Sequence, residues 1–126
     1  MSGAVKRATR VAERLREDLS SLMRELGDPR VLGVLVTRVE ITDDLQSAKV
    51  YVRHELGSDD EGAKKTMLKG IQAASGRLRR EIARTMRLRV VPTLRFFYDE
   101  GPDAMRRVEE LLREIKSEGS GGGDGA

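Results

Sequence analysis

The chain has 126 residues, a formal net charge of +3, one histidine and no cysteine. This length suits one domain, and the lack of cysteine excludes disulfides, zinc–thiolate sites and thiol catalysis. The N-terminal residues contain no apolar run of signal-peptide length, and no stretch of the sequence suits a membrane span. We therefore expect a monomeric cytosolic protein that makes no membrane contact and uses no metal or cofactor.

The N-terminal half predicts a helix followed by a β-hairpin. Apolar residues recur at helical spacing over residues 5–26, and Gly27 with the Asp28-Pro29 turn ends this helix. Residues 32–41 are mostly apolar and β-branched, and residues 48–53 alternate strictly, which is typical of two strands. On the second strand we expect Ala48, Val50 and Val52 to face the core. The alternate residues Lys49, Tyr51 and Arg53 should face outward.

The central region predicts two helices that meet at a glycine. Apolar residues keep helical spacing over residues 61–88, and this period passes through Gly76 without a break. One rod of that length would measure roughly 42 Å, which is long for a domain with a radius of gyration of about 13 Å. A glycine inside a helix also costs about 1 kcal/mol relative to alanine. We therefore predict a junction at Ala74-Ser75-Gly76.

The C-terminal part predicts a third strand and a last helix. Residues 90–92 end the preceding helix, residues 94–98 form the strand, and Gly101-Pro102 begins the last helix. Its apolar residues are expected to form a buried stripe of Met105, Val108, Leu111, Leu112 and Ile115. The Gly-rich residues 117–126 cannot bury apolar surface and are expected to be a disordered tail, which leaves residues 1–116 as the folded domain.

Positive charge is concentrated in the central region. Ten basic residues and one acidic residue lie between Lys64 and Arg95, whereas the rest of the chain has an excess of acidic residues. On a helical wheel four arginines fall within an arc of about 80°, opposite the apolar side of the helix; they are Arg77, Arg80, Arg84 and Arg87. Like charges at these spacings repel. The row therefore favours a polyanionic partner over a merely solvated face.

Two features of the junction add to this pattern. Three lysines on the preceding helix extend the positive field, namely Lys64, Lys65 and Lys69. A glycine lets the backbone of a ligand approach closely, and the N-terminus of the second helix offers N–H groups to phosphate. The alternative, that Gly76 serves only the packing of the bend, stays open.

Four parts of the sequence carry a resemblance to a known family: the N-terminal helix leading into Asp28-Pro29-Arg30, the hairpin VTRVEITDDLQSAKVYV, the Ala74-Ser75-Gly76 step, and LRVVPTLRFFYD before a final helix. In their order and spacing they resemble the ribosome-binding factor A family, over residues 8–112. The resemblance implies an α+β, type II KH-like domain with the order α-β-β-α-kink-α-β plus a C-terminal helix. It also implies a three-stranded sheet covered by helices. In this family an Ala-x-Gly kink replaces the Gly-x-x-Gly loop with which ordinary KH domains clamp nucleic acid.

The resemblance further implies a non-enzymatic ribosome assembly factor. Such a factor binds the 30S subunit and 16S rRNA and supports late small-subunit maturation and 16S rRNA 5′-end processing, especially in cold-stressed cells. It assigns the kink to residues 74–76 and the rRNA-contacting surface to the basic helix that follows. Within one KH-like RNA-binding domain of residues 1–116, the predicted RNA-binding set is Lys64, Lys65, Lys69, Ala74, Ser75, Gly76, Arg77, Arg80, Arg84 and Arg87.

Two other binding functions stay open. A helix-turn-helix DNA-binding protein could use Gly76 as its turn, although the following helix offers only Ser75 and Thr85 to base edges. A protein–protein adaptor could use the basic face for an acidic partner. No catalytic or metal site is expected, because His54 is the only histidine and is interpreted as a surface residue. Tyr51 is the one candidate for stacking on RNA bases from an exposed position.

Overall fold

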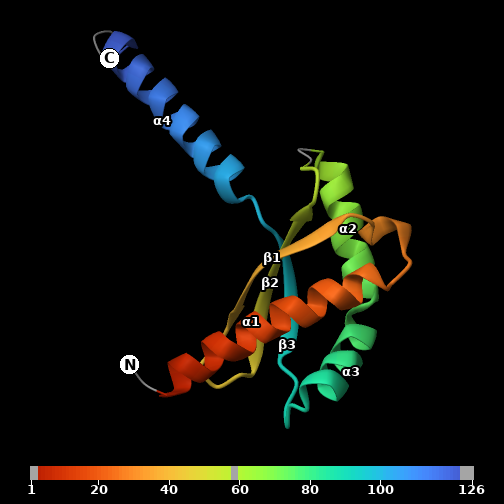
Figure 1. Ribbon diagram of the computed structural model, residues 1–126. Coiled ribbons are helices and arrows are strands. Elements are labelled where there is room, and N and C mark those ends of the chain that lie inside the picture. The colour runs from red at the N-terminus through yellow and green to blue at the C-terminus, as the bar shows by residue number, and fades with distance from the viewer. Residues whose placement is uncertain (1–2, 58–59, 123–126) are drawn as a thin grey trace.

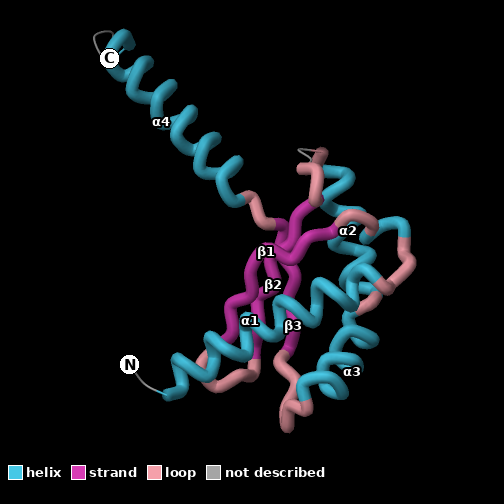
Figure 2. Tube along the Cα trace, viewed as in Figure 1, coloured by secondary structure: helices cyan, strands magenta, loops and turns pink. Residues whose placement is uncertain are grey.

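The computed structural model describes residues 3–57 and 60–122. Within them the chain forms, in order, α1 (Gly3–Arg24), the short 3-10 helix η1 (Pro29–Val31), β1 (Val34–Ile41), β2 (Ser47–His54), α2 (Glu61–Ala73), α3 (Ser75–Met86), β3 (Thr93–Tyr98) and α4 (Gly101–Gly122). Figures 1 and 2 show α1, α2 and α3 on one side of the sheet and α4 extending away from it. The predicted α+β class and the order of the elements are confirmed.

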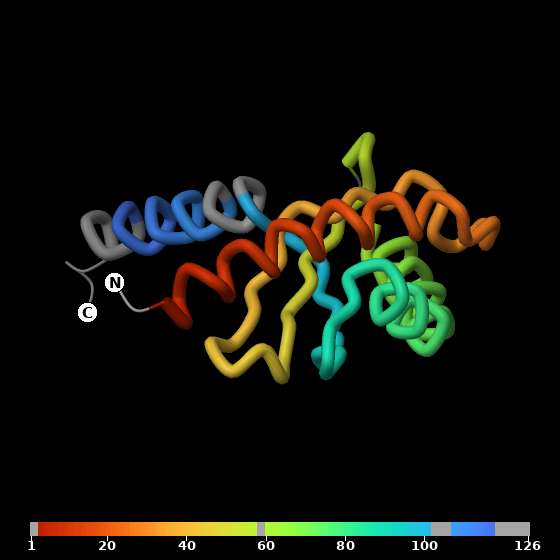
Figure 3. The backbone as a smooth tube through the Cα atoms, turned by 60° about the horizontal axis from the view of Figure 1, so that its bottom comes forward, coloured from red at the N-terminus to blue at the C-terminus, as the bar shows by residue number. Residues whose placement is uncertain are grey.

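The three strands form one sheet in the order β1-β2-β3. β1 and β2 pair antiparallel, as the predicted hairpin requires, whereas β2 and β3 pair parallel. A parallel pair needs a long crossover connection, and here α2 and α3 provide it. Because α1 lies across the same face of the sheet as this crossover (Figure 3), the described elements cover one sheet face and leave the other open.

The core lies between the covered sheet face and the three helices. The alternation predicted for β2 is confirmed, since Ala48, Val50 and Val52 are buried and Lys49 and Arg53 are exposed. The helices contribute residues at helical spacing, and the largest of them are fully buried: Leu15, Leu19, Met23, Met67, Ile71, Leu78 and Ile82. Burying such side chains stabilises the fold by roughly 1.5–3 kcal/mol each.

α4 differs from its prediction. Its apolar residues Val108, Leu111, Leu112 and Ile115 are about half exposed or more, reaching 63% at Ile115, and Figure 1 shows the helix leaving the sheet without folding back. The expected buried stripe is therefore wrong for these four residues, and the side chain of Met105 lies outside the described part. Helical periodicity indicates an apolar face but does not identify what covers it.

The last helix overlaps the predicted tail. α4 extends to Gly122, past residue 116 where the folded domain was predicted to end, and the disorder of residues 117–126 stays a prediction. Adding a residue to an existing helix forms one more hydrogen bond at a lower entropic cost than starting a helix. The remaining part of the predicted tail, residues 123–126, lies outside the described residues. Among the described helices, none has the length and apolar content needed to cross a membrane.

Removing α4 is expected to leave the rest of the fold intact. A chain that ends at Gly101 should unfold at a midpoint within about 3 °C of the full chain, because the exposed stripe buries little surface against the body. Differential scanning calorimetry measures this. Leu19→Ala in the shortened chain is the positive control and should cost about 2–5 kcal/mol. A midpoint more than about 8 °C lower in the shortened chain would show that α4 packs on the domain.

Candidate nucleic-acid interface

The junction between α2 and α3 lies at the predicted position. The two helices are separated by Ala74, whose φ of −90° and ψ of −1° depart from regular helix. Its N–H donates to the carbonyl oxygens of Gly70 and Ile71, at 3.2 and 3.0 Å, and its own carbonyl accepts from the N–H of Leu78 at 2.9 Å. The chain thus bends at Ala74 while this residue keeps its own backbone hydrogen bonds. Ala74 is half-buried against the core, so it shapes the bend rather than presenting a side chain.

The start of α3 has no side-chain cap in the described structure, because Ala74 occupies the N-cap position. The first N–H groups of a helix lack partners within the helix and point along its axis, where the helix dipole favours negative charge. Ser75 is half-buried and Gly76 is exposed at this end.

The space around Gly76 separates the two interpretations of this glycine. A Cβ placed on it would meet one atom, the Arg80 guanidinium nitrogen, at an ordinary contact distance of 3.7 Å. Its φ is also outside the left-handed region that favours glycine. Neither the fold nor the backbone therefore requires glycine here, which removes the support for a role limited to packing.

Gly70, by contrast, is required by packing. A Cβ on this residue would lie 2.8 Å from the Cβ of Arg30 and 3.0 Å from Cγ1 of Val31, because α2 passes directly over η1. Both distances are shorter than side chains tolerate without a shift. Sequence reasoning missed this glycine, since its helical period gives no sign of a close neighbour.

Four exposed arginines follow Gly76 along α3. Arg79 donates to the carbonyl oxygen of Val91 at 3.4 Å. The other three lie in the predicted arc, and we call Arg77, Arg80 and Arg84 the α3 arginine row. Arg84 lies 3.5 Å from the carboxylate of Glu81, yet its side chain is 77% exposed. An ion pair at such exposure contributes about 1 kcal/mol or less. Arg84 can therefore exchange this partner for a phosphate at low cost.

Arg87 does not belong to this row. α3 ends at Met86, and Arg87 is its C-cap residue, with a left-handed φ of 52° and ψ of 39°. The helical wheel placed Arg87 in the same arc because it continued the helix to residue 88. After the change in backbone direction, helical angles no longer apply to this side chain.

The three lysines of α2 are divided between surface and interior. Lys65 and Lys69 are exposed, whereas Lys64 is 6% exposed. The Nζ of Lys64 lies 3.1 Å from Glu100 and 3.3 Å from Glu61, and 4.8 Å from the centre of the Tyr98 ring. Because the charge of Lys64 is already paired beneath the surface, this lysine is less available to a phosphate than Lys65 and Lys69, and its role as an RNA contact stays a prediction.

The Lys64 pairs predict a pH dependence. The hydrogen bond with Glu100 raises the pKa of Lys64 above its usual 10.5, against the opposing effect of burial. A raised lysine pKa stabilises the fold below pH 10.5, and this contribution is lost as the pH rises through the folded-state pKa. In urea unfolding at pH 8, the free energy of unfolding of wild type should exceed that of Lys64→Met by about 1 kcal/mol or less. At pH 11.5 this difference should be smaller. A difference that does not narrow would contradict the ionic role.

His54 also differs from its prediction as a surface residue. It is half-buried, its ring centre lies 6.0 Å from that of Tyr98, and its Nε2 is buried. Its position was visible in the pattern, because it continues the inward-facing alternation of β2. Among the described residues no cluster of three or more histidine, aspartate or glutamate side chains could hold a metal ion.

Known proteins match this chain along most of its length. The family profile described as ribosome-binding factor A matches residues 7–112. A relative from Sorangium cellulosum, named ribosome-binding factor A, is 77% identical over 121 residues, which cover 96% of this chain and 98% of the relative.

Solved structures agree with this match. The crystal structure of ribosome-binding factor A from Thermus thermophilus superposes with a TM-score of 0.63 at 26% identity, over 72% of this chain and 93% of that one. A Thermus thermophilus model fitted into a cryo-EM map of a 30S complex has a TM-score of 0.57 at 30% identity, over 70% and 90% of the two chains. With a family match over residues 7–112 and a 77% identical relative, the chain belongs to the ribosome-binding factor A family.

Proposed function

We propose that this protein is a non-enzymatic assembly factor that binds the small ribosomal subunit through the α2–α3 junction. Its partners are the 30S subunit and 16S rRNA, and its contact residues are Lys65, Lys69, Ser75, Gly76 and the α3 arginine row. Support comes from the family match and from the relative that is described in a 30S complex. The observation that carries the proposal is the exposed Gly76, which the fold does not need and which begins the row of arginines.

The mechanism is electrostatic docking on the rRNA backbone. A phosphate approaches the uncapped start of α3, where Gly76 leaves room for close contact with the backbone. The guanidinium groups of the α3 arginine row then hold successive phosphates, since arginine pairs with phosphate through two parallel N–H donors. Lys65 and Lys69 extend the positive field along α2.

The proposed biological role is late maturation of the small subunit, including processing of the 16S rRNA 5′ end. A factor that binds by phosphate contacts and shape can hold one rRNA arrangement while separate enzymes complete processing. In cold-grown cells depleted of this protein, the wild-type gene should restore the mature 5′ ends of 16S rRNA, as measured by primer extension. A gene without the α3 arginine row should fail to restore them.

Crosslinking tests the site directly. Irradiating the complex with 30S subunits at 254 nm and identifying RNA-bearing peptides by mass spectrometry should give peptides from residues 65–84. A complex that forms but gives no RNA adduct from this segment would contradict the assignment of the junction as an rRNA contact.

A further inference from the structure

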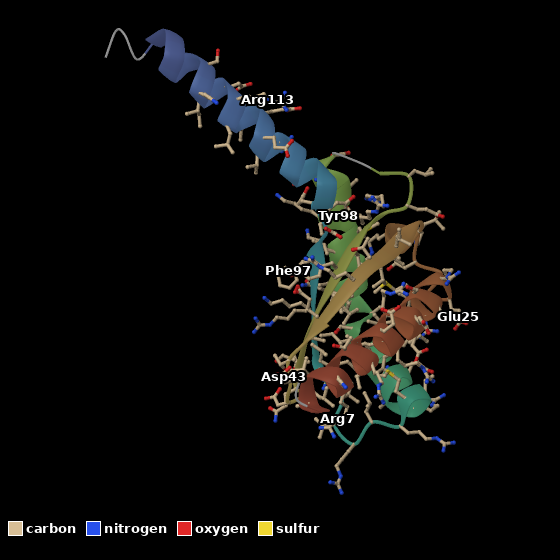
Figure 4. All side chains as sticks on the ribbon, turned by 60° about the vertical axis from the view of Figure 1, so that its left-hand side comes forward. Arg7, Glu25, Asp43, Phe97, Tyr98 and Arg113 are labelled. Atoms are coloured by element: carbon tan, nitrogen blue, oxygen red, sulfur yellow. The ribbon has the colours of Figure 1, made fainter. Side chains whose placement is uncertain are left out.

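The open face of the sheet carries a second group of basic and aromatic side chains. No helix of the described structure covers this face, and in Figure 4 the labelled Phe97 lies on the side of the sheet away from α1. The side chains that the strands direct to it, which we call the open sheet face, are Leu35, Arg38, Glu40, Lys49, Tyr51, Arg53, Arg95 and Phe97.

A β-bulge places Arg38 on this face. Val36 pairs with Val52 and points to the core, so strict alternation would also direct Arg38 inward. The register shifts between these residues, and Arg38 pairs with Tyr51 on the outward side. The residue in the bulge, Thr37, places its hydroxyl 3.2 Å from the carbonyl oxygen of Tyr51. Bulges often re-aim a side chain, and this one brings a guanidinium over a ring.

The result is a row of three flat groups across the three strands. The Arg38 guanidinium carbon lies 4.1 Å from the centre of the Tyr51 ring. The rings of Tyr51 and Phe97 are register partners on neighbouring strands, with centres 5.7 Å apart and planes 31° apart. Phe97 is 39% exposed. A large aromatic side chain held in place and left open to solvent offers a stacking surface to a base.

Basic residues flank this aromatic row. Lys49 and Arg95 are direct register partners on β2 and β3, and both are exposed. Like charges directly opposite one another destabilise a sheet, and an anion between them would relieve that repulsion. Arg53 lies on the other side of the row, and the one acidic side chain of the group, Glu40, is 3.8 Å from Arg38. The face therefore combines excess positive charge with the exposed ring of Phe97 and the half-buried ring of Tyr51.

We propose that the open sheet face binds a short unpaired segment of RNA. One base stacks on Tyr51 and Phe97, Arg38 holds the Tyr51 ring from the opposite end of the row, and Lys49 and Arg95 bind the neighbouring phosphates. Single-stranded RNA is the occupant that uses both features, because a duplex offers phosphates but no free base face. This site is separate from the α2–α3 junction and does not depend on it.

The test is fluorescence anisotropy with a labelled 12-nucleotide single strand and with a 12-base-pair RNA duplex as the comparison probe. Phe97→Leu keeps an apolar side chain but removes the aromatic ring, and should weaken binding of the single strand about tenfold. Phe97→Tyr should retain wild-type affinity. Lys49→Gln with Arg95→Gln should reduce the slope of log affinity against log salt by about 1.4.

A charge-matched control is Arg107→Gln with Arg113→Gln, which removes two exposed positive charges from α4, the helix that extends away from the sheet (Figure 4). It should bind the single strand like wild type. The proposal would be overturned if wild type, Phe97→Leu and the Lys49/Arg95 variant bound the single strand with equal affinity. It would also be overturned if Phe97→Leu lost affinity for the single strand and for the duplex to the same extent. The proposal would also be overturned if the wild-type chain bound no oligonucleotide but still retained a partner protein after nuclease treatment, and if Phe97→Leu lost that partner. This test is independent of the α2–α3 junction, because the role of the α3 arginine row is measured separately, by binding to 30S subunits.

Discussion

Replacing Arg77, Arg80 and Arg84 with glutamine should weaken binding to 30S subunits by roughly 100-fold at about 0.1 M salt. Each phosphate contact contributes about 0.7–0.9 to the slope of log affinity against log salt. The slope should therefore fall by about 2–3 in the triple variant. Sedimentation at several salt concentrations measures both quantities, and the variant should fold normally because all three side chains are exposed.

The matched control removes three positive charges elsewhere. Arg107, Arg113 and Lys116 on α4 are also exposed, and glutamine at these positions should change the slope by less than that of one phosphate contact. If both triple variants lose affinity to the same extent, net charge rather than the α3 arginine row governs binding.

Gly76→Ala is expected to separate stability from binding. Alanine is favoured over glycine within a helix, and the added methyl meets only Arg80 at 3.7 Å, so the free energy of unfolding should rise by about 0.5–1 kcal/mol. The same methyl occupies the space through which a phosphate backbone would approach α3. Affinity for 30S subunits should therefore fall by about tenfold, which corresponds to 1.4 kcal/mol.

Gly70→Ala is the partner experiment, with the opposite sign on stability. Its methyl would enter the contact between α2 and η1, at 2.8 Å from Arg30, and overpacking of this kind costs about 1–3 kcal/mol. Chemical denaturation gives the stability of both variants. A Gly76→Ala protein that is more stable and still binds 30S subunits like wild type would show that this glycine has no role in binding.

The parts of the fold that local patterns specify were predictable. Strict alternation identified the faces of β2, because a strand with one buried face repeats every two residues. The junction at Ala74 was predicted from the length of the helical segment together with Gly76, since periodicity continued through it. The core residues of α1, α2 and α3 follow from helical spacing in the same way.

The differences arise where a neighbour distant in sequence decides the outcome. α4 has the pattern of a packed helix, but no described segment covers its stripe. Lys64 sits in a basic run, yet Glu100 and Tyr98 come from the end of β3 and the residues after it to neutralise and cover it. The outward position of Arg38 depends on a bulge, which no residue pattern in β1 indicates.

The central claim is tested most directly by sedimenting the protein with purified 30S subunits, 50S subunits and a DNA duplex, at low and at physiological salt. A shape-specific rRNA site at the α2–α3 junction predicts retention on 30S subunits alone at the higher salt. Equal retention on all three at low salt, lost together as salt rises, would contradict it and would make the α3 arginine row a general polyanion-binding surface.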